Sequence, residues 1–369
     1  MGLSVGKIAE KLDIANQDLI DWEEGTEYPP LSTFEKLAKL YKRHTAFFYL
    51  PSVPKKCKKR EADFRTLPRY HSTPDTSPEF LYYLQKVYRR QVIALELLEE
   101  LEEESLPLIP RSNLHEDPEE VAQRLRSALN IASSTQFKWS KSYHALAGWI
   151  SAVEKLGVLV FKSSNAKVSL EEMRGLAIWD KSLPVIALNA SDTDNGKIFT
   201  LMHELTHLSL HQNGVWGFND NQSNSSSEVE VFCNHVAGSI LVPNQLLTDN
   251  PAVITLPLDC NHLSNKDIQV IARKFCVSGE VILRRLLILG KISQPFYEEK
   301  CQYLRSLPIP KKSGGAPSVY AKTIVSREGY LFPRIVLRAM FEEKIPKNKA
   351  SSYLNTKIKH FGSLEELVL

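Results

Sequence analysis

Apolar residues recur every three to four positions through most of the chain, which is the spacing of helices with one buried face. This pattern predicts helices over residues 5–12, 16–24, 32–41, 79–104, 141–156, 198–211, 229–241, 266–275, 279–289 and 333–361. Short apolar or alternating runs predict strands over residues 158–161, 175–179 and 184–188. The Asn- and Ser-rich stretch 212–227 is predicted as a loop. The expected fold class is α+β and mainly α, with a small β-sheet packed on the helix at 198–211.

Proline, glycine and charge mark the breaks between these elements. Gly25 is expected to end the helix at 16–24, and Ser32 with Glu35 is a predicted capping box at the start of the next helix. The proline- and lysine-rich stretch 51–60 is typical of a linker. From these breaks we predict segments over residues 1–54, 55–140, 141–250, 251–300 and 301–369, of which the third contains the sheet.

Composition excludes several protein classes. The chain has 369 residues, 43% of them hydrophobic and 24% charged, which is ordinary for a globular protein and unlike a disordered or collagen-like chain. No apolar run approaches the roughly 20 residues that span a bilayer. Seven acidic residues among the first thirty argue against a secretory signal. Five cysteines without a CxxC pair predict reduced thiols and a cytoplasmic location. The net charge of +3 indicates no particular partner, and oligomeric state stays open.

The strongest chemical signal is His203-Glu204-Leu205-Thr206-His207, an HExxH motif inside a predicted helix. Residues four apart lie one turn apart on the same helix face, so both imidazoles can reach one ion at about 2.0–2.1 Å, as zinc requires. Glu204 lies just off that line, where it can act as general base on a water that the zinc activates. The motif therefore predicts a zinc site with His203 and His207 as ligands and Glu204 as the catalytic residue.

A third zinc ligand is expected on the helix at 229–241. At about 100° per residue, Glu230 lies on the edge of that helix's apolar stripe, whereas Glu228 points to the solvent side. A carboxylate aimed at a core is costly unless it is paired or binds a metal, which favours Glu230 over Glu228. Asn234, one turn further on, is a candidate to hydrogen-bond a ligand from outside the metal's own shell.

Two other histidines and one cysteine in this region are given structural roles. His211 lies about 12 Å along the helix axis from His203, too far for one ion to join them. His235 points away from Glu230 and is expected at the surface or in packing. Cys233 is expected to be a buried, inert core residue.

These motifs resemble the zinc-peptidase domain of the ImmA/IrrE family. The resemblance is carried by the HExxH motif, by Glu230-Val231-Phe232-Cys233-Asn234, and by Ala237-Gly238-Ser239-Ile240-Leu241-Val242-Pro243. Cys233 stands for the family's usual Ala and Thr206 for its common Gly; neither change removes a ligand. The resemblance implies that residues 141–250 form a zinc metallopeptidase domain. It also implies an endopeptidase whose protein substrate is a helix-turn-helix repressor of damage-response or mobile-element genes.

The segment 1–54 resembles an XRE-like helix-turn-helix whose first helix is missing. Ala9, Ile14, Leu19 and Trp22 occupy the packing positions of that motif. The missing helix is expected to leave part of Ile8, Leu12 and Leu19 uncovered. In such a module the helix at 16–24 enters the major groove of DNA. Candidate DNA contacts are Asn16, Gln17, Lys55, Lys56, Lys58 and Lys59.

Charge weakens the DNA-binding interpretation of this segment. Residues 1–50 hold six basic and eight acidic side chains, which is no electrostatic footprint for phosphate. A vestigial or protein-docking module is the alternative. A second helix-turn-helix-like pattern lies at 272–286, where Arg284 and Arg285 are candidates to face substrate, although packing of its apolar residues explains most of the pattern.

Two functions from different classes therefore follow from the sequence. The first is a zinc endopeptidase acting on a repressor protein. The second is a DNA-binding transcriptional regulator, or antitoxin-like protein, in which the peptidase domain is silent. Neither interpretation gives residues 301–369 a role.

Overall fold

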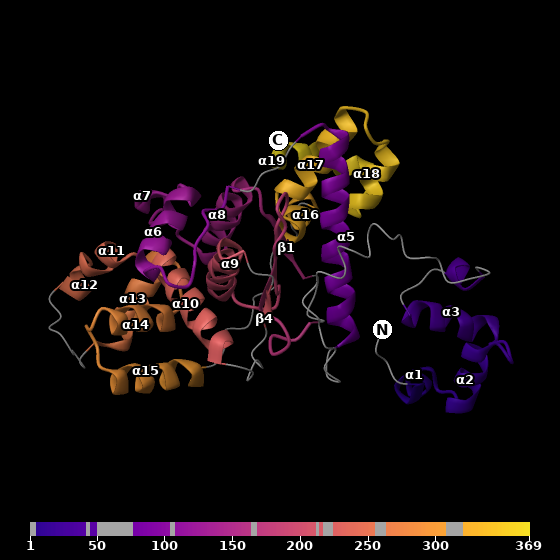
Figure 1. The fold of residues 1–369 in the computed structure, drawn as a ribbon, viewed down its shortest axis with the longest axis horizontal. Helices are drawn as coiled ribbons and strands as arrows, with labels where there is room; N and C mark the ends of the chain where they lie inside the picture. Colours follow the sequence, from indigo (N-terminus) through magenta and orange to yellow (C-terminus); the bar gives the residue numbers. More distant parts are fainter. Residues whose placement is uncertain are drawn as a thin grey trace. The chain divides into compact units, whose positions relative to one another are not determined.

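The computed structural model describes residues 5–41, 45–49, 77–103, 108–163, 168–211, 214–216, 224–254, 263–307 and 320–369 (Figure 1). The chain forms two compact units, Met1–Tyr82 and Tyr83–Leu369. The candidate DNA contacts Lys55, Lys56, Lys58 and Lys59 lie outside the described residues.

The first unit is built from α1 (Val5–Leu12), α2 (Asn16–Glu24), α3 (Leu31–Leu40) and the 3-10 helix η1 (Thr45–Tyr49). α2 ends at Gly25, whose left-handed backbone (φ 78°) suits glycine. The predicted capping box is wrong, because α3 begins at Leu31 after Pro30 and no side chain caps it. The predicted exposure of Ile8 and Leu19 is also wrong, because Leu37 of α3 packs against both and all three are buried. Leu12 is half-buried.

A four-stranded sheet lies at the centre of the second unit. Its strands are β1 (Leu159–Lys162), β2 (Gly175–Ile178), β3 (Val185–Leu188) and β4 (Gly214–Trp216), in the order β1-β3-β2-β4. β1 and β3 run parallel, and the other pairs are antiparallel. The loop predicted at 212–227 is wrong at β4 and at residues 224–227, where the helix Asn224–Leu241 begins. Three residues in a polar stretch carry too short a pattern to be recognised as a strand.

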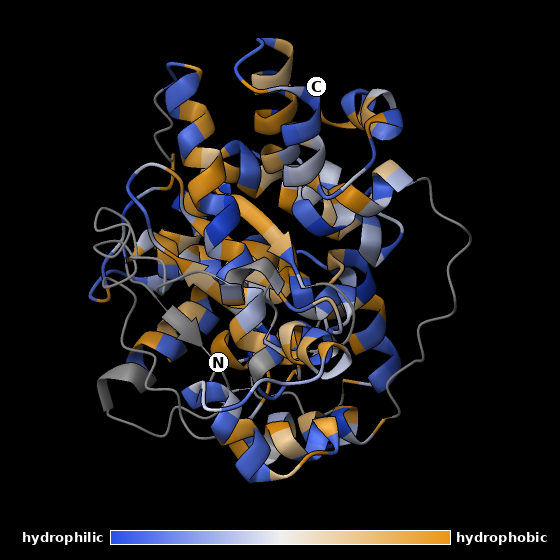
Figure 2. Cartoon of the chain, turned by 90° about the vertical axis from the view of Figure 1, so that its right-hand side faces the viewer, coloured by the Kyte–Doolittle hydropathy of each residue, from blue (hydrophilic) through white to orange (hydrophobic). Residues whose placement is uncertain are grey.

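Helices cover both faces of this sheet, which explains why its strands are mostly apolar, with Lys162 at the end of β1 as an exception. On one face lie α8 (Ser142–Lys155) and α9 (Asp194–Ser209), and on the other α16 (Tyr320–Glu328) and α17 (Leu331–Phe341) pack on β1. Phe161 of β1 meets Phe332 of α17 edge to face, with ring centroids 5.8 Å apart. Arg90 of α5 (Pro78–Glu100) lies over the same Phe161 ring. Figure 2 shows apolar strands enclosed by helices with polar outer sides.

A second group of helices packs beside α9. It consists of α6 (Pro118–Leu129), α7 (Ser133–Gln136), α10 (Asn224–Leu241), α11 (Asn244–Thr248), α12 (Pro251–Ile254), α13 (Asn265–Phe275), α14 (Gly279–Ile288) and α15 (Gln294–Ser306). α10 lies between α9 and α6 and makes extensive contacts with both. These helices and the inner side of the sheet share one apolar core. His203 and His207 lie within this core, and Glu230 lies at its edge.

The C-terminal helices are more broken than the pattern predicts. The expected single stretch at 333–361 is wrong, because α17 is followed by α18 (Lys347–Leu354), the 3-10 helix η2 (Ile358–His360) and α19 (Phe361–Val368). Left-handed Glu343 and Asn355 end two of these helices, and Pro346 precedes α18. The mainly helical α+β fold class is confirmed. Among the described residues, no helix combines the length and apolar character needed to cross a membrane.

Candidate metal centre

The HExxH motif lies on α9, the most deeply buried helix around the sheet. The side chain of Thr193 caps this helix by accepting a hydrogen bond from the backbone N–H of Gly196, 3.0 Å away. Ile198, Leu201, Leu205 and Leu208 are fully buried, as their helical spacing predicts. The same spacing places His203 and His207 one turn apart on the side that faces α10.

Three side chains meet between α9 and α10. The Nε2 atoms of His203 and His207 are 3.1 Å apart, Glu230 Oε2 lies 3.3 Å from His203 Nε2, and Glu230 Oε1 lies 3.2 Å from His207 Nε2. Two ligand atoms bound to one tetrahedral zinc at about 2.0–2.1 Å are about 3.3 Å apart. The three side chains are therefore close enough together to hold one zinc ion. Among the described residues, these three form the group of metal-binding side chain types that lie close enough together to hold an ion.

Glu230 reaches the centre because of its position on α10. Cys233, Val236, Ala237 and Ile240 bury the stripe of α10 that faces the core, and Glu230 lies at its edge. Its side chain is 31% exposed, so the centre is open to solvent on this side, while Glu228 is exposed and outside the cluster. The structure thus brings Glu230, not Glu228, to the two histidines.

Charges at the centre are set by burial and by the Glu230 contacts. Burial raises the pKa of Glu230, but its hydrogen bonds to His203 and His207 outweigh burial and lower the pKa to about 2. Burial lowers the pKa of His207, whereas for His203 the contacts with Glu230 and Glu204 outweigh burial and raise the pKa. The centre therefore holds an ionised carboxylate beside two ring nitrogens, which is a suitable donor set for zinc.

Glu204 lies next to these atoms and is not one of them. It is 2% exposed, and its Oε2 atom has no hydrogen-bond partner in the described part of the chain. Burial raises its pKa to about 8, with the Glu230 charge adding to the rise and His203 opposing it. A buried carboxyl that lacks a partner is costly in a folded chain, so such a group points to a ligand or a water at this position.

Gly175 is a residue of the site that sequence analysis missed. It begins β2 directly opposite α9, and a Cβ atom there would lie 2.8 Å from Glu204 Oε1 and would overlap the Thr200 methyl group. The glycine thus lets the strand approach Glu204 closely. A glycine at the start of an apolar strand is the available signal, since glycine in strands often marks close approach of a neighbour.

The outer nitrogens of the two histidines have contacts of their own. His203 donates from Nδ1 to Asn234 Oδ1 at 3.1 Å, the contact expected of Asn234. Cys233 is buried, as predicted, but it is not remote from the site, because its Sγ lies 3.7 Å from His207 Nδ1. Burial raises the pKa of this thiol well above its usual range, so it stays protonated.

The remaining candidates lie away from the centre. His211 stacks on Trp179 with centroids 3.9 Å apart, and His235 pairs with Glu119. Arg285 is fully buried and does not face a substrate, while Arg284 lies over the Tyr297 ring. Asn16 and Gln17 are exposed on α2 in the first unit, where Gln17 donates to Asp21.

Comparison with known proteins agrees with this geometry. No curated protein matches the chain. Residues 153–287 match the model of the IrrE N-terminal-like domain, a peptidase family. The match takes in the sheet, α9 with its HExxH motif, and α10, and it continues through α13 into α14. Residues 153–287 are therefore similar to the IrrE N-terminal-like peptidase domain, in line with the resemblance of the site motifs.

Proposed function

We propose that this chain is a zinc-dependent endopeptidase that cleaves a helix-turn-helix repressor and so derepresses stress or mobile-element genes. The observation that carries the proposal is the meeting of two imidazoles and one carboxylate, close enough to share an ion, beside the unpartnered oxygen of Glu204. The peptidase family match supports the reaction class. The repressor substrate rests on the resemblance of the site motifs to the ImmA/IrrE family.

His203, His207 and Glu230 would hold the zinc ion. Two imidazoles and one carboxylate leave a fourth position open, which distinguishes a catalytic zinc site from a structural one. When bound, zinc supplies Lewis acidity to the water and to the peptide carbonyl. The partial exposure of Glu230 supports access of a substrate from that side.

Glu204 would carry the proton during hydrolysis. As general base it takes a proton from the attacking water on Oε2, and as general acid it gives that proton to the leaving amine. A buried carboxyl whose pKa is about 8 holds a proton readily near neutral pH, which suits the second role. A neighbouring cation favours the ionised carboxylate, which suits the first.

The test is cleavage of a helix-turn-helix repressor that is co-expressed with the full chain and followed by immunoblot. Wild type should cleave it and bind one zinc per chain. Glu204→Gln should keep the zinc and lose about 10² to 10⁴ of the rate. Glu171→Gln is the matched control, because Glu171 is exposed and lies outside the cluster. Wild type without stoichiometric zinc, or Glu204→Gln at full rate, would contradict the proposal.

The DNA-binding regulator remains the alternative, and the first unit gives it little support. α2, the helix that would enter the major groove, carries Asp18, Asp21, Glu23 and Glu24 and no basic residue. Such a helix is repelled by phosphate. If Glu204→Gln acts like wild type while Trp22→Ala abolishes function, the regulator is correct and the peptidase is silent.

A further inference from the structure

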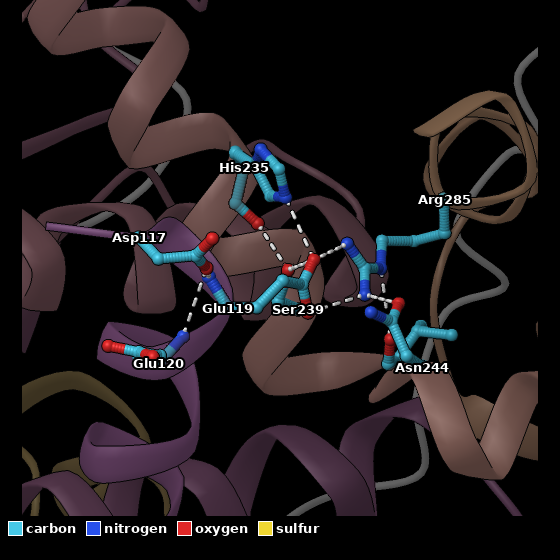
Figure 3. Close-up of polar contacts among 8 residues, drawn as sticks. Asp117, Glu119, Glu120, His235, Ser239, Asn244 and Arg285 are labelled. Atoms are coloured by element: carbon cyan, nitrogen blue, oxygen red, sulfur yellow. Dashed lines mark hydrogen bonds and ion pairs between the residues drawn. The ribbon is translucent and has the colours of Figure 1, made fainter. Parts of the chain in front are cut away.

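A polar cluster on the far side of α10 joins three helices. Its centre is Glu119 of α6, whose carboxylate pairs with Arg285 of α14 through both oxygens, at 2.5 and 3.0 Å. Oε1 of Glu119 also accepts hydrogen bonds from His235 Nε2 at 2.8 Å and from Ser239 Oγ at 2.9 Å, both on α10 (Figure 3). One carboxylate thus joins α6, α10 and α14.

The Arg285 side chain is buried and has further hydrogen-bond partners besides Glu119. It is fully buried, donates from Nε to the Val242 carbonyl at 3.0 Å, and contacts Asn244 Oδ1 (Figure 3). Its side chain passes over Gly238 of α10, where a Cβ would lie 3.3 Å from Arg285 Cδ. Glycine inside a helix lowers stability by about 1 kcal/mol relative to alanine. At position 238 the missing side chain leaves room for Arg285. The end of α10 is therefore built around this ion pair.

The two polar faces of α10 are almost opposite each other. At about 100° per residue, His235 and Ser239 lie about 140–180° from Glu230, and Asn234 lies within about 40° of it. A rotation of α10 that breaks the contacts with Glu119 therefore also moves Glu230 and Asn234 away from the histidines. A site of this kind loses function when its ligands move by about 1 Å.

We propose that Glu119 is a positioning residue, which sets the rotation of α10 and thereby places Glu230 and Asn234 at the metal centre. Glu119 lies outside the matched residues 153–287, so a helix preceding the recognised domain is part of the same working unit. This inference rests on the proposed metal site and deepens it.

The test is zinc affinity of the full chain, measured with zinc chloride and a competing chelator, together with the melting temperature without metal. The first variant is Glu119→Gln, which keeps the size of the side chain and removes its charge. Its control is Glu120→Gln, the exposed neighbour on α6. The zinc affinity of Glu119→Gln should fall by about 10- to 100-fold, which is the range seen when residues that support a metal ligand are replaced. The zinc affinity of Glu120→Gln should stay unchanged.

Because Glu119→Gln leaves buried Arg285 without its anion, this variant is at risk of unfolding. A second variant, His235→Phe with Ser239→Ala, removes the contacts of α10 and keeps the Glu119–Arg285 pair. It should remain folded by circular dichroism and still lose about tenfold in zinc affinity. Wild-type affinity in this variant would overturn the positioning role. Unchanged affinity in the variants of a wild type that binds zinc overturns the positioning role alone, whereas a wild type that binds no zinc overturns the proposed function, so the two failures are distinguishable.

Discussion

Glu204 and Glu154 are both buried carboxyl groups in the second unit, and burial raises the pKa of each to about 8. Their surroundings differ. Glu154 accepts hydrogen bonds from the backbone N–H groups of Tyr330 at 2.8 Å and Leu331 at 3.1 Å, where α17 begins. Glu204 Oε2 has no partner among the described residues. The satisfied carboxyl holds α8 and the C-terminal helices together, whereas the unsatisfied one faces a position that a reactant can fill.

Removal of a metal ligand should have the largest effect and should separate the two regions. His207→Ala is expected to lower zinc affinity at least about a thousandfold, because one of three protein ligands is lost. Glu154→Gln should bind zinc as wild type does, since its contacts lie at α17. Chelator competition measures both. A large loss of affinity in Glu154→Gln would show that the two regions are coupled and would break the comparison.

The next largest effect should be a pH dependence of the unfolding free energy that comes from Glu154. Its pKa is about 8 when folded, against an ordinary value of 4.5, so between these values the folded chain holds a proton that the unfolded chain has released. The stability from this group is complete below about pH 4.5 and is lost as pH rises through about 8. Urea unfolding of the metal-free protein should show a loss of a few kcal/mol between pH 5 and 8.

The control for this pH dependence is Glu154→Gln, which cannot titrate at this position. The difference in unfolding free energy between wild type and the variant isolates Glu154, because Glu204 and the histidines titrate in both proteins. A difference that stays constant from pH 5 to 8 would show that Glu154 is ionised throughout. In that case its backbone hydrogen bonds outweigh its burial.

Close packing around Glu154 gives a smaller effect. Gly329 is left-handed (φ 69°), and a Cβ there would lie 2.7 Å from the Val160 carbonyl oxygen and overlap Glu154 Oε1. Gly290 has a similar φ of 64° with open space around it. Gly290→Ala should therefore cost about 1 kcal/mol from backbone strain alone. Gly329→Ala should cost about 2 kcal/mol more from the clash. Equal melting temperatures for the two variants would show that Glu154 and the Val160 carbonyl are not packed closely against Gly329.

The same contrast explains what the sequence could and could not reveal. His203 and His207 are four apart on one helix, and Glu230 lies at the edge of an apolar stripe, so local periodicity alone points to them. Glu154 contacts residues 176 and 177 positions away, and Glu119 contacts Arg285 at a separation of 166. No periodic pattern encodes such pairs, because they depend on how the helices are packed.

Gly175 and β4 were only partly predictable from the sequence. Gly175 could have been noted as a strand glycine, but its neighbour Glu204 becomes visible only when β2 lies against α9. β4 is recognisable through its pairing with β2 and not through its own three residues. The apolar pattern of the first unit predicted α1 to α3 in order, while its helix-turn-helix resemblance and DNA binding stay predictions.

Asn234 should give the smallest effect and sharpen the role of the contacts behind the ligands. It accepts a hydrogen bond from His203 Nδ1, which fixes the ring so that Nε2 faces Glu230. Because Asn234 is exposed, Asn234→Ala should leave the melting temperature of the metal-free chain nearly unchanged and lower zinc affinity about tenfold. Glu228→Ala, an exposed change on the same helix, is the control. Equal zinc affinity in both variants would mean that α9 alone orients His203, and the centre would then depend on Glu230 as its single contribution from α10.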